Sequence, residues 1–170
     1  MNTAMPQDNN NMLIPCIKIG KIAAVRSKLE QGADPNERDQ GNRTPLHWAA
    51  QEGFLDIVRC LIKFGAQLNL VDDLGFTPLA VAAGEGHDAI VRALVTAGAS
   101  PNVKIHANEN GTALHLACSW GRTDVVRALV ELAGADLNAR DGTGKAPLTY
   151  ALEAGHEELA AYLRTRSAVT

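Results

Sequence analysis

The stretch Thr44-Pro45-Leu46-His47 decides how this chain folds, because close copies of it recur further along the sequence. The copies run from Thr77 to Ala80, from Thr112 to His115 and from Ala146 to Thr149, and their first residues lie 33, 35 and 34 positions apart. A period of this length, sustained down most of a chain, indicates a protein built from stacked structural repeats. Such a protein presents a long surface and has no obvious chamber for chemistry.

Other residues recur with the same period. One glycine falls in the middle of each unit, and a Gly-Ala pair follows later, with an asparagine four residues after the glycine of the pair. The middle glycines are Gly20, Gly53, Gly86, Gly121 and Gly155, and the pairs begin at Gly32, Gly65, Gly98 and Gly134. In these features the sequence resembles the ankyrin repeat, whose unit is a turn or hairpin followed by two antiparallel helices.

The resemblance implies an all-α solenoid of helix-turn-helix units joined by β-hairpin-like loops. It covers residues 11–166 as a single domain, with well-matched repeats at about 39–71, 72–104 and 107–140. Degenerate units at about 11–38 and 141–166 would cap the ends, where polar substitutions protect a face that has no neighbour. Residues 1–10 are polar and rich in asparagine, so we expect a flexible N-terminal segment there.

The recurring blocks have the chemistry of a helix start. The threonine that opens three of them can accept hydrogen bonds from the N–H groups of the first helical turn. The proline that follows in three of them would stand at the first helical position, where a missing N–H costs nothing. The middle glycines suit a left-handed turn between helices. A second amphipathic helix then follows, with apolar residues at helical spacing, as in Ile57, Val58, Leu61 and Ile62.

Composition restricts the class of protein. The chain has 170 residues, 46% of them hydrophobic, and a net charge of −3, which gives no general attraction to nucleic acid. We see no N-terminal signal pattern and no apolar run long enough to span a bilayer, so no membrane partner is expected. The three cysteines are odd in number and lie inside repeats, which points to reduced thiols and a cytoplasmic location.

One pair of residues has a spacing that could serve catalysis. His115 and Cys118 lie three apart on a predicted helix, which could place a thiol beside a base. The competing interpretation is structural, because His47 matches His115, and small residues match Cys118. The resemblance implies that this histidine ties one loop to the next. We therefore predict no catalytic residue, no cofactor and no metal site.

Positions that are not part of the repeat framework indicate where a partner binds. Aromatic residues make up only 4% of the chain, yet both tryptophans fall at such positions. In the ankyrin fold these positions line the concave groove and the loop tips, and aromatic residues ringed by charges are typical of interface hot spots. The predicted partner-binding residues are Arg43, Trp48, Glu52, Leu74, Phe76, Val81, Glu85, Glu109, Leu116, Trp120, Lys145 and Tyr150. The alternative is that Trp48, Val81, Leu116 and Tyr150 stack on one another as additional core.

Two further features leave alternatives open. The loop from Val103 to Gly111 is two residues longer than its counterpart, which suits a binding face or neutral drift in an exposed loop. One arginine per unit, at Arg26, Arg59, Arg92 and Arg127, could form a basic ladder for an acidic partner. The ladder could instead be a solvated face, because Asp56, Asp88 and Asp124 can pair with the last three arginines along the helix.

The sequence thus predicts a non-catalytic interaction module, namely a stand-alone inhibitor or regulator that captures a protein partner in its concave groove and is monomeric when free. The alternative from a different class is a structural or adaptor subunit of a permanent complex, which should expose a large apolar surface. Charged residues among the aromatics favour the regulator. An enzyme would need activity that is lost with Cys118→Ala.

Overall fold

The computed structural model describes residues 12–167, so the predicted flexible segment at residues 1–10 lies outside the described residues. The part described forms ten α-helices in five successive pairs. The pairs are α1 (Ile14–Lys18) with α2 (Ile22–Glu30), α3 (Pro45–Gln51) with α4 (Leu55–Lys63), α5 (Pro78–Glu85) with α6 (Asp88–Thr96), α7 (Ala113–Ser119) with α8 (Thr123–Glu131), and α9 (Pro147–Glu153) with α10 (Glu157–Ser167). The predicted all-α solenoid is confirmed.

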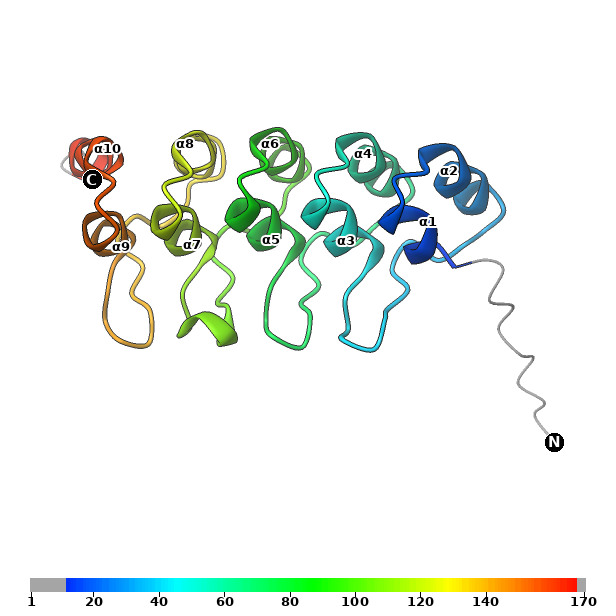
Figure 1. Cartoon of the computed structure of the whole chain (residues 1–170), viewed down its shortest axis with the longest axis horizontal. Helices are drawn as coiled ribbons and strands as arrows, with labels where there is room; N and C mark the ends of the chain where they lie inside the picture. Colours follow the sequence, from blue (N-terminus) through cyan, green and yellow to red (C-terminus); the bar gives the residue numbers. More distant parts are fainter. Residues whose placement is uncertain (1–11, 168–170) are drawn as a thin grey trace.

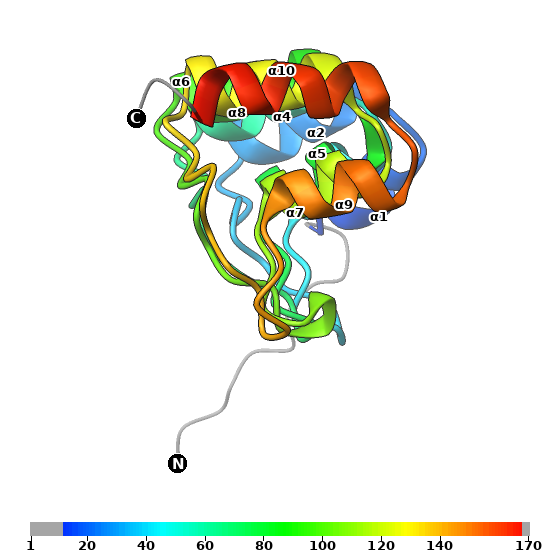
Figure 2. The same cartoon turned by 90° about the vertical axis from the view of Figure 1, so that its left-hand side faces the viewer.

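The pairs stack side by side into two layers. Figure 1 shows the odd-numbered helices in one row and the even-numbered helices in the row above, with the loops hanging below the odd row. Figure 2, a view along the stack, shows the successive units nearly superimposed and the loops projecting to one side. In the described part of the chain, the only β-bridge outside helices joins Ile105 to Gly111, so the loops are hairpin-like turns rather than strands.

The predicted helix starts are confirmed. Helices α3, α5 and α9 begin at a proline, as expected from the recurring blocks. The Thr77 hydroxyl accepts from the N–H of Ala80 at 3.2 Å, which satisfies one of the free donors of the first turn of α5. Thr44 and Thr112 cap α3 and α7 in the same way, with a histidine side chain completing the cap.

The core runs through the whole stack without interruption. The leucines that open the first helices are fully buried, as are the apolar residues on one side of the second helices. In successive repeats these residues are Leu46, Leu79 and Leu114, then Val58, Val91 and Val126, and Leu61, Leu94 and Leu129. Their burial relies on contacts between neighbouring helix pairs, such as α3 with α5 and α5 with α7. Each repeat therefore depends on its neighbours for stability.

Two buried histidines join consecutive loops. The backbone N–H of Thr44 donates to Nδ1 of His47 at 3.1 Å, which leaves the proton on Nε2, and Nε2 donates to the carbonyl of Phe76 at 2.9 Å. His115 bonds Thr112 and the carbonyl of Lys145 in the same way. Burial lowers the pKa of both imidazoles, so both are neutral near neutral pH. These ties agree with the structural role that the resemblance implies.

The recurring asparagines make a second set of ties. The side-chain oxygen of Asn36 accepts from the backbone N–H of Gln67, 31 residues later, at 2.7 Å. Asn69 accepts from the N–H of Ser100 in the same way, and Asn102 accepts from the N–H of Asp136. Each bond joins the end of one repeat to the end of the next and so fixes their register.

In the second to fifth repeats, the residue after the middle glycine reaches back over the preceding repeat. Gly86 has a φ of +85°, a left-handed conformation that favours glycine, and the Arg122 side chain lies 2.9 Å from where a Cβ would stand. Nε of Arg122 donates to the carbonyl of Gly84 at 3.3 Å. His87 and His156 make the equivalent bonds to the carbonyls of Gln51 and Ser119.

The longer loop is held by backbone bonds on both sides. It follows α6 and contains a short 3-10 helix, η2 (His106–Asn108). The N–H of Ala107 donates to the carbonyl of Leu74 at 3.0 Å, and the carbonyl of Glu109 accepts from the N–H of Gly142. Ile105 in the same loop is fully buried. The two extra residues are thus packed into the row of loops.

We expect Leu129→Ala to lower the free energy of unfolding by about 2–5 kcal/mol, because it opens a cavity in a fully buried part of α8. Chemical denaturation measures this change. Leu132, at the end of the same helix, is 53% exposed and provides the matched control. Leu132→Ala should change stability by less than about 0.5 kcal/mol. Equal effects would contradict the assigned packing of α8.

The stability of the protein should fall as the pH drops below 6.5, the ordinary pKa of histidine. His47 has a lowered pKa, so the unfolded chain binds a proton there that the folded chain does not, and acidification favours unfolding. His47→Gln should reduce the slope of unfolding free energy against pH, between about pH 6.5 and pH 5.5, by up to about 1.4 kcal/mol per pH unit.

His115→Gln should reduce the slope in the same direction, because His115 is buried in an equivalent position. Urea denaturation at several pH values measures both variants. A slope unchanged in both would contradict the neutral state of the two imidazoles.

Candidate protein-binding surface

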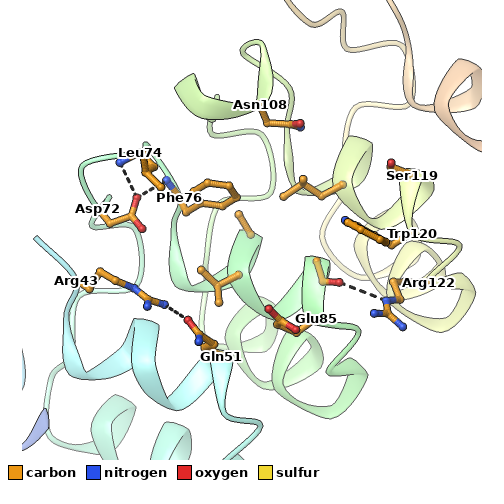
Figure 3. A pocket seen from close by; sticks show the side chains of 14 residues that line it. Arg43, Gln51, Asp72, Leu74, Phe76, Glu85, Asn108, Ser119, Trp120 and Arg122 are labelled. Atoms are coloured by element: carbon orange, nitrogen blue, oxygen red, sulfur yellow. Dashed lines mark hydrogen bonds between the residues drawn. The ribbon is translucent and has the colours of Figure 1, made fainter. Parts of the chain in front are cut away.

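A groove of about 780 Å³ crosses the middle repeats between the loop tips and the odd-numbered helices. Its floor comes from α5 and α7, with Val81 and Leu116, while Leu74 and Phe76 on the loop before α5 form one side. Figure 3 shows Arg43 at one end of this groove and Trp120 with Arg122 at the other. The groove is therefore apolar in its middle and has a guanidinium group at each end.

Many of the predicted partner-binding residues meet in this groove. Trp120 and Leu74 stand on its rim, 64% and 57% exposed, while Phe76, Val81 and Leu116 are half-buried. The predicted residues that line the groove are Arg43, Leu74, Phe76, Val81, Glu85, Leu116 and Trp120. The remaining predicted residues, which do not line it, are Trp48, Glu52, Glu109, Lys145 and Tyr150. That any of them contacts a partner stays a prediction.

Trp48 is held by contacts within the chain. Its indole Nε1 donates to Oδ2 of Asp39 at 2.9 Å, and the Arg43 guanidinium lies 4.1 Å from the ring centroid. Lys18 of α1 also contacts the ring, at 3.7 Å. Nη2 of Arg43 in turn donates to Gln51 at 2.5 Å. We call Asp39, Arg43, Trp48 and Gln51 the N-terminal clasp.

Tyr150 is held in the corresponding way near the other end of the stack. Its hydroxyl donates to Oδ2 of Asp141 at 2.6 Å, and Nζ of Lys145 lies 5.8 Å from the ring centroid and donates to Glu153 at 2.8 Å. We call Asp141, Lys145, Tyr150 and Glu153 the C-terminal clasp. The spacing of the four residues is the same in both clasps, so the two arise from equivalent positions of two repeats.

Hydrogen bonding shifts the pKa values of the ionisable groups in the clasps. Burial acts to raise the pKa of Asp141, but hydrogen bonds from Tyr150, Thr143 and the N–H of Lys145 outweigh it and hold the pKa well below its usual range. The bond to Asp141, together with burial, raises the pKa of Tyr150 to about 12. Asp39 shows the same balance, because bonds from Arg43, Trp48 and Gly41 lower its pKa against the effect of burial. Both carboxylates are therefore ionised near neutral pH.

The burial of these positions tests the alternative that the variable positions of the first helices are additional core. Trp48, Val81, Leu116 and Tyr150 are all half-buried, and all pack against the core. They contribute to stability, and each keeps part of its surface accessible. Among the predicted aromatic contacts, Trp120 is the most exposed, at 64%, and it is not among the residues that pack against the core.

Seven lining residues were not among the predicted partner-binding residues, namely Gln51, Asp72, Ala80, Gly84, Asn108, Ser119 and Arg122. Asp72 accepts hydrogen bonds through Oδ1 from the N–H groups of Leu74 and Phe76, and so shapes that loop tip. Asn108 lies on the longer loop, and Arg122 follows Gly121. Arg122 could have been found from the repeat alignment, because it replaces the histidine seen at His87 and His156. No sequence signal placed the side chain of Asn108.

The arrangement around Cys118 does not suit nucleophilic catalysis. Cys118 is fully buried, and burial raises the pKa of its thiol to about 12, so the thiolate is scarce near neutral pH. Between residues 12 and 167, no cluster of three His, Cys, Asp or Glu side chains could hold a metal ion. None of the helices described there is long and apolar enough to cross a membrane.

The arginine ladder is only partly a row of paired charges. Nε of Arg92 contacts Asp88 at 2.9 Å, as predicted, and the pair is partly exposed. Arg127 instead stacks on the ring of Tyr162, at 4.8 Å. Arg59 and Arg92 border a shallower hollow of about 540 Å³ between α4 and α6, on the side of the stack away from the groove. Exposed pairs of this kind stabilise a fold by less than about 1 kcal/mol.

Comparison with known proteins identifies the class. The sequence profile of the family described as ankyrin repeats (3 copies) matches residues 13–105 and 102–169. The chain belongs to the ankyrin repeat family, whose fold is a non-catalytic module for protein interaction.

Similar stretches occur in several curated proteins. The chain is 42% identical over 50 residues to Rabankyrin-5 of Homo sapiens, which is 29% of this chain and 4% of that protein. It is 45% identical over 53 residues to protein phosphatase 1 regulatory subunit 12A of Mus musculus, which is 31% of this chain and 5% of that protein. It is 40% identical over 63 residues to NF-kappa-B inhibitor cactus of Drosophila melanogaster, which is 36% of this chain and 12% of that protein. The chain thus matches only a small part of each relative.

We expect Tyr150→Phe to lower the free energy of unfolding by about 1–3 kcal/mol, because it leaves the buried Asp141 without its strongest donor. Tyr162→Phe is the matched control, since its hydroxyl donates at 3.1 Å to the exposed Glu131. The control should lower the free energy of unfolding by less than about 0.5 kcal/mol. Thermal and chemical denaturation measure both, and equal costs would show that the clasp does not hold the ring.

Proposed function

We propose that this chain is a non-catalytic inhibitor or regulator that captures a protein partner in its central groove. The observation that carries the proposal is the groove itself, where exposed Trp120 and Leu74 flank half-buried Phe76, Val81 and Leu116. Large apolar side chains gathered beside charged groups are typical of interaction sites. The partner is a protein rather than nucleic acid, because the net charge is −3.

The relatives support a regulatory role. Their names include an inhibitor, NF-kappa-B inhibitor cactus, and a regulatory subunit, that of protein phosphatase 1. A third relative, at 39% identity over 46 residues, is 26S proteasome non-ATPase regulatory subunit 10 of Dictyostelium discoideum. In each case the similarity is confined to a short stretch, so the partners of those proteins are not carried over to this chain.

One observation favours the alternative of a subunit in a permanent complex. Leu152 on α9 is 37% exposed, whereas Ala50, Ala83 and Cys118 at the equivalent positions are fully buried by the next repeat. A partner could cover this leucine at the end of the described stack. The regulator remains the better proposal, because the groove is mixed in character, with Arg43, Glu85 and Arg122 on its border, and we expect a monomer when free.

Trp120→Ala should leave the melting temperature nearly unchanged and weaken partner binding by tenfold or more, because an exposed indole at a groove contributes to binding and little to the core. Parallel affinity capture from cell extract, with mass spectrometry, compares wild-type and variant baits. Arg59→Ala, on the side of the stack away from the groove, is the matched control and should capture the same proteins as wild type. The same partner held equally by the Trp120 variant would move the interface away from the groove.

A further inference from the structure

The hydrogen bonding of Arg43 is incomplete. Its Nη2 donates to the side-chain oxygen of Gln51 at 2.5 Å, but its Nε is buried and has no hydrogen-bond partner among the described residues. A buried donor without a partner costs about 1–3 kcal/mol. Arg43 lines one end of the groove, so an acceptor on a bound partner could reach it from there.

The C-terminal clasp shows which group is absent from the N-terminal one. Lys145 occupies the position equivalent to Arg43, and its Nζ donates to the carboxylate of Glu153. Gln51 occupies the position equivalent to Glu153, so a neutral amide stands where the other clasp has a carboxylate. The chain thus supplies the counter-charge for Lys145 at this position and does not supply it for Arg43.

Two acidic residues near Arg43, Asp39 and Asp72, already accept hydrogen bonds within their own loops. Asp39 accepts from the N–H groups of Gly41 and Arg43 and from the Trp48 indole. Oδ1 of Asp72 accepts from two backbone N–H groups at the next loop tip. A second cation, Lys18, contacts another member of this clasp, the Trp48 ring. The donor capacity of Arg43 therefore remains for a partner.

We propose that the segment bound in the groove carries an aspartate or glutamate whose carboxylate binds Nε and Nη2 of Arg43 and displaces the amide oxygen of Gln51. This inference rests on the proposed function. Nε and the adjacent Nη form a planar fork that matches the two oxygens of a carboxylate. The apolar side chains of the same segment then lie against Phe76, Val81 and Leu116.

A second unpartnered donor supports an extended segment. Nδ2 of Asn108 is also buried without a hydrogen-bond partner, and Asn108 lies on the opposite side of the groove from Arg43. Both unpartnered side-chain atoms identified among the described residues are donors, so the complementary ligand supplies acceptors. A polypeptide that crosses the groove would offer its carboxylate to Arg43 and a main-chain carbonyl to Asn108.

The test begins with short random peptides displayed on phage and selected on the immobilised full chain. We expect the enriched peptides to share an acidic residue at a fixed distance from a large apolar residue. A selected peptide is then synthesised with its acidic residue or with the matching amide, and both are titrated by fluorescence anisotropy. The amide form should bind wild type roughly tenfold more weakly, as expected for the loss of a charge-assisted hydrogen bond.

Three variants of the N-terminal clasp, with one control variant in the C-terminal clasp, separate the carboxylate contact from other effects. Arg43→Gln should bind the acidic and amide peptides equally, which gives a coupling energy between the two groups. Arg43→Lys keeps the charge without the fork and should recover only part of the difference. Gln51→Glu places a carboxylate within the chain and should weaken the acidic peptide roughly tenfold, whereas the matched Glu153→Gln, in the other clasp, should not. Melting curves confirm that each variant is folded.

The outcomes distinguish the inference from the function on which it rests. Peptides that lose binding with Trp120→Ala but show no acidic preference and no coupling to Arg43 would overturn the inference and leave the groove as the binding site. Peptides whose affinity is unchanged by substitution of Trp120 or Phe76 would overturn both the inference and the groove as the binding site. Failure to enrich any peptide would contradict the inference that the ligand is an extended segment with an acidic residue.

Discussion

The structure depends on one constraint, which is that a single repeat cannot bury its own apolar faces. Leu79 and Leu94 of the repeat containing α5 and α6 are fully buried because α3 and α4 cover one side of this repeat and α7 and α8 the other. The hydrophobic free energy of each unit is therefore obtained only in the stack. As a consequence, the side chains on the loop-bearing face are held in fixed positions relative to one another, although they come from distant parts of the sequence.

Hydrophobic burial does not by itself set the register of the loops, and hydrogen bonds across repeats do. His47 reaches the carbonyl of Phe76, and the equivalent bond from His115 reaches that of Lys145. Between them, Ala80 occupies the histidine position and cannot make this bond. There the longer loop is anchored instead by the backbone bond from Ala107 to Leu74 and by buried Ile105. Ala80 itself is among the residues that line the groove.

The sequence predicted the fold well because the fold is determined by local chemistry that repeats. Threonine caps, proline at the first helical position and the left-handed conformation of glycines such as Gly86 each follow from one or two residues. The clasps could not be predicted in this way. Nothing in the sequence shows that the side chain of Trp48 folds back to a carboxylate nine residues earlier, because that contact depends on the path of the intervening loop.

The same limit applies to the site. The variable positions were predicted from the repeat alignment, and many of them meet in one groove because they fall on adjacent units. The partner of each polar group was not predictable. The hydrogen bonding of Arg43 depends on where the Gln51 side chain lies. The helical spacing allows Asp88 to pair with Arg92, but whether they pair depends on their rotamers.

Several departures from the repeat pattern lie together, although Phe54 and Thr149, which also stand where other repeats have a histidine, do not line the groove. Ala80 replaces a histidine, Val81 stands where the clasps have Trp48 or Tyr150, and Arg122 replaces a histidine. Trp120 and the longer loop with Asn108 complete the set, and all five border the same groove. Substitutions that served only stability would have no reason to gather at one surface, since every repeat meets the same packing requirement. A regular framework with several of its exceptions at one groove supports the proposal that the framework supplies rigidity and the groove supplies binding.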